Sequence, residues 1–139
     1  MGYVYSGSGL DELAKGETPQ VGRGECVDLI KKFVPGLKGK STAVWRAGAW
    51  VMEPGAIIRR GTAIATFDKD GRFPQHHSGQ HAAIVLSVMP SGIWVVDQWR
   101  SKAKISKRLI RIPPPHRQRN PDGSFPDASN NALAFRVIE

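Results

Sequence analysis

Apolar residues follow a helical spacing most clearly in residues 26–33. Cys26 and three of the apolar residues behind it are spaced three and four apart, which places them on one helical face. The pattern predicts a helix that begins at Cys26 and ends near Pro35-Gly36, because proline cannot continue a helix and glycine suits a left-handed cap. Shorter helices are predicted for residues 10–15 and 41–48, the second with a serine cap and a glycine end.

The second half of the chain shows short apolar runs separated by turn residues, which is the pattern of a β-sheet. Strands are predicted at residues 61–67, 81–88, 93–99, 108–112 and 133–138. Helices first and hairpin-connected strands afterwards are typical of an α+β fold, with N-terminal helices packed on an antiparallel sheet of about five strands. A chain of 139 residues is long enough for one core but not for two, so we expect residues 1–139 to form a single domain.

The formal net charge of +8 implies attraction to polyanions, such as nucleic acid, anionic lipid or acidic cell-wall polymers. Residues 100–119 hold eight Lys or Arg residues and no Asp or Glu, and the simplest interpretation is a solvated basic face. The N-terminus lacks a basic region followed by an apolar run, and no segment has the length of a membrane span. We therefore expect a soluble protein without a signal peptide.

Cys26 is the only cysteine, which excludes an intrachain disulfide and leaves packing to hold the fold. At the start of a helix, a thiol feels the partial positive charge of the N-terminus, which favours the reactive thiolate. Such a thiol is expected to react rapidly with alkylating agents near neutral pH. The residues alone equally allow Cys26 to be a small buried apolar side chain. A catalytic role requires a histidine and an orienting polar group elsewhere in the chain.

His81 and Asp97 are the best candidates for those two groups. His81 opens an apolar strand and Asp97 lies inside the next one, so each is costly unless it has a hydrogen-bond partner. In an antiparallel pair they share a face only if the connection has an odd length or the strand carries a bulge. A regular hairpin with an even loop would place Gln98 toward His81 instead. We prefer Asp97, because a carboxylate both fixes the tautomer and stabilises the imidazolium.

Four segments resemble the papain-like cell-wall hydrolases, the CHAP and NlpC-type cysteine amidases and peptidases. They are Gly-Glu-Cys-Val at 24–27, Gly-Thr-Ala-Ile-Ala at 61–65, His-Ala-Ala-Ile-Val at 81–85 and Val-Val-Asp-Gln-Trp at 95–99. Their order and the small size of the chain are most similar to the type VI secretion amidase effectors. The resemblance covers about residues 20–100. In CHAP domains the third strand typically carries Glu-Gln-Asn, where this chain has Asp97-Gln98-Trp99.

The resemblance implies a papain-like fold with Cys26 as the nucleophile, His81 as the base that later becomes the acid, and Asp97 as the orienting group. The backbone amide of Cys26 would be one donor to the oxyanion. Gln20, six residues before Cys26, and a tyrosine such as Tyr5 or Tyr3 are candidates for the second donor, and Gln98 is the alternative orienting group. No metal or cofactor is expected.

The resemblance also implies a biological setting. The substrate would be an amide bond of the peptidoglycan stem peptide or its cross-link. The protein would be made in the cytoplasm, secreted, and active in the periplasm of a target bacterium. Its partner would be a cognate immunity protein that plugs the cleft, with an acidic surface to match the charge. We expect a monomer that does not bind membranes.

Other interpretations use parts of the same sequence. A non-enzymatic nucleic-acid-binding module is supported by the charge of residues 100–119 alone, without a helix-turn-helix or an aromatic-rich basic strand. A phage or autolytic wall hydrolase would keep the fold but change the setting. A metal site could use His76, His77 and His81, but the sequence between them disfavours a helix and there is no HExxH pattern. His116 follows three prolines and is expected to be exposed.

Overall fold

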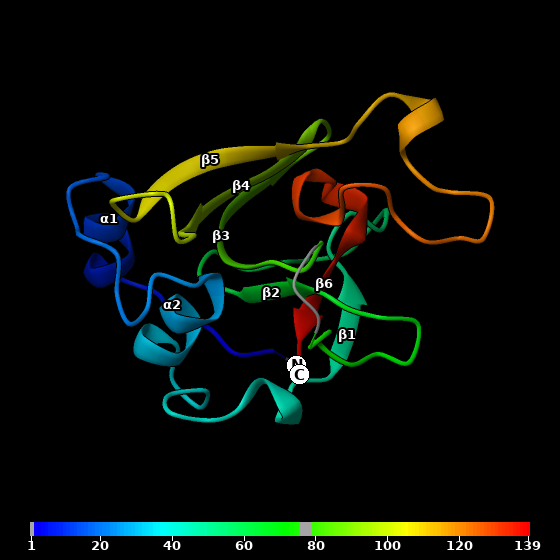
Figure 1. Cartoon of the computed structure of the whole chain (residues 1–139). Helices are drawn as coiled ribbons and strands as arrows, with labels where there is room; N and C mark the ends of the chain where they lie inside the picture. The colour runs from blue at the N-terminus through cyan, green and yellow to red at the C-terminus, as the bar shows by residue number, and fades with distance from the viewer. Residues whose placement is uncertain (1, 76–78) are drawn as a thin grey trace.

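The chain forms two α-helices, several single turns of 3-10 helix and one sheet in a computed structural model that describes residues 2–75 and 79–139 (Figure 1). The helices are α1 (Ser8–Ala14) and α2 (Cys26–Phe33), and the 3-10 turns are η1 (Thr42–Val44), η2 (Pro115–Arg117), η3 (Ala128–Asn130) and η4 (Ala132–Ala134). The strands are β1 (Ala47–Trp50), β2 (Ala63–Thr66), β3 (Ala82–Met89), β4 (Gly92–Asp97), β5 (Ser106–Arg111) and β6 (Phe135–Ile138).

The six strands of the described chain form one antiparallel sheet in the order β1-β6-β2-β3-β4-β5. This confirms the predicted α+β architecture and adds one strand to the expected five. The added strand is β1, where a helix ending at Gly48 was predicted. That prediction was wrong because the serine cap supports only the single turn η1. The backbones of Arg46 and Glu139 then exchange two hydrogen bonds, which direct the chain along the sheet edge.

Both faces of the sheet are apolar, and each is covered by a different part of the chain. Helices α1 and α2 lie over one face, as Figure 1 shows, where they form a core cluster with residues of β3 and β4. The opposite face packs against residues of η4 and the segment after β1. The first cluster includes Leu10, Leu13, Leu29, Ile30, Ala82, Ile84 and Val96, and the second includes Val51, Val85, Val95, Ile110 and Phe135. Burial of these side chains supplies the main driving force for folding.

A bulge in the β3–β4 hairpin sets the face on which each site residue lies. Next to the two-residue turn, Val88 pairs with Ile93, but farther along Val85 pairs with Val95, so Leu86 is an extra residue in β3. The shift puts His81 and Asp97 on the same face, which is the arrangement that was predicted if the strand carries a bulge. Without the bulge, the two-residue turn would place Gln98, the residue after β4, on the same face as His81 in place of Asp97.

The loop before α2 is held in a tight conformation by the helix that it precedes. The Asp28 carboxylate accepts hydrogen bonds from the backbone amides of Arg23 (2.9 Å) and Glu25 (3.2 Å). Gly22 has a φ of 61°, and a Cβ atom there would lie 2.7 Å from the Asp28 carboxyl carbon. Only glycine therefore fits, and the close approach fixes the path of the backbone into Cys26.

We predict that Gly22→Ala is much more destabilising than Gly39→Ala. Both residues have a positive φ, but a Cβ atom at Gly39 meets nothing within 4 Å. Gly39→Ala should therefore lower the free energy of unfolding by about 1 kcal/mol from backbone strain alone. Gly22→Ala adds a clash and should cost roughly 2 kcal/mol or more. Urea denaturation of both variants measures the difference. Equal losses in the free energy of unfolding would mean that the loop adjusts to the added Cβ atom at little cost.

Candidate active site

Cys26 is the first residue of α2 and its thiol is half-buried against the start of β3. Burial raises the pKa of the Cys26 thiol to about 11, although hydrogen bonds from the backbone of Ala82 and Val27 act in the opposite direction. Burial therefore opposes the thiolate that the helix N-terminus was expected to favour, and the pKa of the thiol lies above its ordinary value. Ala82 directly follows His81, so the sulfur lies beside the backbone that carries the imidazole.

His81 is fixed by its ring and by its backbone. The ring Nε2 lies 2.8 Å from Oδ2 of Asp97, and the two residues are 5% and 0% exposed. The His81 amide donates to Thr66 Oγ1 (3.0 Å), and the Thr66 amide donates to the His81 carbonyl (3.0 Å). Because Asp97 occupies Nε2, Nδ1 is the ring nitrogen left to exchange a proton with a group in the cavity.

Asp97 is surrounded by positive charge. Lys102 Nζ lies 2.8 Å from Oδ1, and Arg108 Nε lies 2.7 Å from Oδ2. Burial by itself would raise the pKa of the Asp97 carboxyl, but the hydrogen bond and charge of His81, with Arg108 and Lys102, hold that pKa well below its ordinary range. The carboxylate is thus a permanent acceptor for the imidazole.

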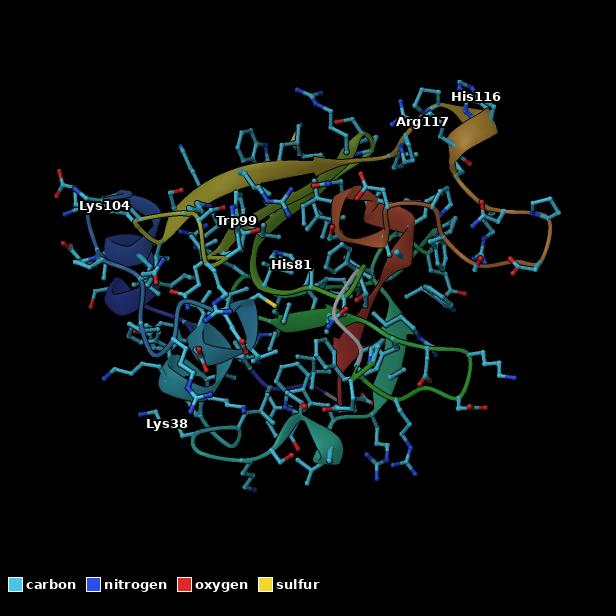
Figure 2. The ribbon with its side chains drawn as sticks, in the orientation of Figure 1. Lys38, His81, Trp99, Lys104, His116 and Arg117 are labelled. Carbon is cyan, nitrogen blue, oxygen red and sulfur yellow. The ribbon has the colours of Figure 1, made fainter. Side chains whose placement is uncertain are left out.

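Two aromatic rings enclose the imidazole. The rings of Trp99 and Phe135 each approach that of His81 edge-on, with 6.3 Å between centroids. Trp99 is 39% exposed and lies next to His81 in Figure 2, so it separates the imidazole from open solvent on one side. The enclosure limits the ring to orientations that keep its bond to Asp97.

Cys26 and His81 line one cavity of about 650 Å³. Its remaining walls come from α2 and the residue before it, from η1, and from the loops after β2 and β4: Glu25, Val27, Lys31, Thr42, Phe73, Pro74, Gln75, Gln80, Trp99 and Arg100. The cavity is large enough to admit a peptide segment beside the thiol. The charged side chains of the walls are Glu25, Lys31 and Arg100. They suit a ligand that carries carboxylates as well as an amine.

Gln98 faces away from the imidazole and secures the loop before α2. Its side chain is fully buried. The Oε1 atom accepts from the Val21 amide (2.9 Å), while Nε2 donates to the carbonyls of Val21 (3.0 Å) and Glu25 (2.8 Å). Gln98 therefore positions the residue that precedes Cys26, and Asp97 is the residue of this pair that contacts His81.

Two of the candidate oxyanion donors, Gln20 and Tyr5, lie outside the cavity lining. The Gln20 amide donates to the carbonyls of Lys102 (2.7 Å) and Arg100 (3.2 Å), so it holds the loop after β4. The Tyr5 ring packs on Phe33, at the opposite end of α2 from the thiol, with 5.6 Å between centroids. Neither is among the described residues that line the cavity.

Lys102 and Arg108 were not predicted as site residues, because both belong to the basic run that was interpreted as a solvated face. A partial signal exists: in β5, Arg108 lies diagonally opposite Asp97 on the same face of the sheet. Figure 2 shows His116 on a projecting segment far from His81. His76 and His77 lie outside the described residues, and the described part of the chain contains no cluster of three potential metal ligands.

Comparisons with known proteins identify the family of the chain. Residues 9–125 match the family model of Domesticated amidase effector 2. The chain is 38% identical over 143 residues to the type VI secretion amidase effector 2 protein of Salmonella typhi, with full coverage of both. It is 41% identical over 91 residues to Domesticated amidase effector 2 of Ixodes scapularis, covering 66% of this chain and 61% of that protein.

A solved structure also matches. That of type 6 secretion amidase effector 2 (Tae2) is 38% identical and superposes with a TM-score of 0.82, covering 99% of this chain and 94% of the other. The family match, the full-length relative and the shared fold lead to one conclusion: this chain belongs to the amidase effector 2 family of the type VI secretion amidase effectors.

Proposed function

We propose that this amidase cleaves peptidoglycan through Cys26, His81 and Asp97, as an antibacterial effector delivered by type VI secretion. One observation carries the assignment of residues. The thiol and the imidazole line the same cavity, and the imidazole is fixed from behind by a buried carboxylate. A nucleophile, a base and an orienting group in this order are the parts that acyl transfer requires.

The raised pKa of Cys26 makes the reaction begin with a neutral thiol. His81 Nδ1 takes the thiol proton as the sulfur attacks the amide carbonyl and a C–S bond forms. The oxyanion is stabilised by the Cys26 backbone amide at the start of α2. The tetrahedral intermediate collapses as His81 returns its proton to the leaving amine and the C–N bond breaks. Water, deprotonated by His81, then hydrolyses the thioester and restores the thiol.

The substrate proposal follows from charge. The stem peptide carries carboxylates, and the net charge of +8 attracts the acidic polymers of the wall. Within the cavity, Lys31 and Arg100 would hold the carboxylates, while Glu25 would hold the amine of a diamino acid. In this proposal Gln20 is a positioning residue for the Arg100 loop rather than an oxyanion donor.

The setting of the activity is also part of the proposal. Within the described residues, no helix has the length and apolar character needed to cross a membrane. Type VI delivery would carry the protein to the periplasm of a target bacterium, and a cognate immunity protein with an acidic surface would block the cavity in the producer. We propose that residues 1–139 act as a single-domain monomer. The effector relatives favour this setting over a phage or autolytic role.

We predict that Cys26→Ala and His81→Ala abolish hydrolysis of purified peptidoglycan while the fold persists. Asp97→Asn should lower kcat by roughly 100-fold, because the amide cannot stabilise the imidazolium. Gln98→Ala should mainly lower the free energy of unfolding, by about 1–3 kcal/mol, since it leaves buried backbone groups without partners. Fragment release followed by mass spectrometry measures activity and also identifies the bond that is cut. A Cys26→Ala variant with full activity would refute the proposed mechanism.

Arg100→Ala should raise KM for a soluble stem-peptide substrate by about threefold with little change in kcat, because an exposed cation contributes modestly to binding. Arg117→Ala is the matched control. It removes the same charge from a segment far from His81, as Figure 2 shows, and should leave KM unchanged. Steady-state kinetics at one salt concentration compares the KM values of the two variants. An equal rise in KM for both would mean that the overall charge, and not the position of Arg100, is responsible.

The raised pKa of Cys26 predicts slow alkylation of the folded protein at neutral pH. The rate with iodoacetamide should rise roughly tenfold per pH unit until the pH approaches the thiol pKa. The protein unfolded in urea is the control, because its solvated thiol should react faster near pH 8. A plateau at neutral pH in the folded protein would instead show a preformed thiolate paired with His81.

A further inference from the structure

We infer that Lys102 and Arg108 are positioning residues for the reaction, which act by keeping Asp97 a fixed carboxylate acceptor while the charge of His81 changes. The inference rests on the proposed function, in which His81 exchanges a proton with Cys26. It assigns a catalytic purpose to two residues of a basic run that the family resemblance leaves without one.

The contacts around Asp97 form a closed set. His81 Nε2 and Arg108 Nε both reach Oδ2, at 2.8 and 2.7 Å, while Lys102 Nζ reaches Oδ1 at 2.8 Å. Lys102 also donates to the carbonyl oxygens of Asp97 and Ser106, both at 3.3 Å. Each carboxylate oxygen therefore has a cationic partner besides the imidazole, and the carboxylate cannot rotate without breaking one of them.

The two cations are themselves held in place. Arg108 donates to Asn130 Oδ1 and to the Ser129 carbonyl, both at 3.1 Å. The Trp99 ring covers both charges, with its centroid 4.5 Å from Lys102 Nζ and 5.3 Å from the Arg108 guanidinium carbon. The side chains are 14% and 22% exposed, so these are partly buried pairs rather than mobile surface pairs.

The reaction gives these cations a specific task. His81 is positive after it takes the thiol proton and neutral after it gives that proton to the leaving amine. In the neutral state, a lone buried carboxylate would face the full cost of desolvation and would tend to bind a proton. Lys102 and Arg108 carry their charge in both states. Asp97 therefore keeps accepting from Nε2–H, and proton exchange is confined to Nδ1.

Removal of one cation should be visible in the pH dependence. The charged groups that face Asp97 are His81 before β3, Lys102 after β4 and Arg108 on β5, with the Cys26 thiol of α2 nearby. Burial favours the neutral acid, so loss of a cation raises the pKa of Asp97. Activity needs the carboxylate, so it should then be lost at a higher pH as the solution is acidified.

The experiment compares Lys102→Met with Lys102→Arg and Lys104→Met in the full-length protein. Lys102→Met removes the charge but keeps much of the apolar stem, and should lower kcat about tenfold with KM nearly unchanged. It should also move the acid limb of the kcat profile to higher pH. Lys102→Arg should restore both. Lys104→Met removes an exposed charge from the same loop, and both quantities should stay as in the parent protein.

A mutant cycle covers the case in which Lys102→Met is also less stable. If Lys102 acts through the Asp97 charge, Lys102→Met should reduce kcat little further in an Asp97→Asn background. A full additional tenfold loss there, or an unshifted acid limb in the single variant, would overturn the inference. Cys26→Ala keeps the two proposals apart: if that variant is inactive while Lys102→Met is normal, only the role of the cations fails.

Discussion

The carboxylate of Asp97 is the charge around which the site is built. A fully buried anion would destabilise most folds, and here three hydrogen bonds to the carboxylate, from His81, Lys102 and Arg108, compensate for its lost hydration. Three separate segments supply those groups: the residue before β3, the loop after β4 and strand β5. Satisfying this one charge therefore aligns three parts of the sheet, and the imidazole is oriented as a result.

The end of β4 links this charge to the Cys26 thiol. Asp97 points to one face of the sheet and holds the imidazole, while Gln98 points to the other and holds the loop that leads into Cys26. Two adjacent residues with opposite side-chain directions thus set the positions of the imidazole and the thiol relative to one strand. A second tie comes from Gln20, which connects the same loop to the segment carrying Lys102.

Sequence periodicity was sufficient for α2 and for the central strands, and the chemistry of a carboxylate was sufficient to choose Asp97 as the partner of His81. Periodicity failed where long-range contacts decide the local structure. Strand β1 forms because the chain end pairs with it, which no local pattern near Gly48 indicates. The basic run concealed Lys102 and Arg108, since a charge pattern does not reveal which side chains turn inward. The thiol pKa depends on how deeply Cys26 is buried, and the position of Cys26 in its helix does not reveal that burial.

The bulge at Leu86 has an evolutionary consequence. Surface hairpins usually tolerate indels, because a longer turn disturbs little beyond itself. In the β3–β4 hairpin, one inserted residue could shift the pairing of the two strands by one position. The side chains beyond the shift would then point to the opposite faces of the sheet, and Gln98 would replace Asp97 beside the imidazole. Lineages that diversify this fold should therefore vary the turn only together with the bulge. The length of the turn would be as constrained as the residues of the cleft, although no turn residue is among the described residues that line the cavity.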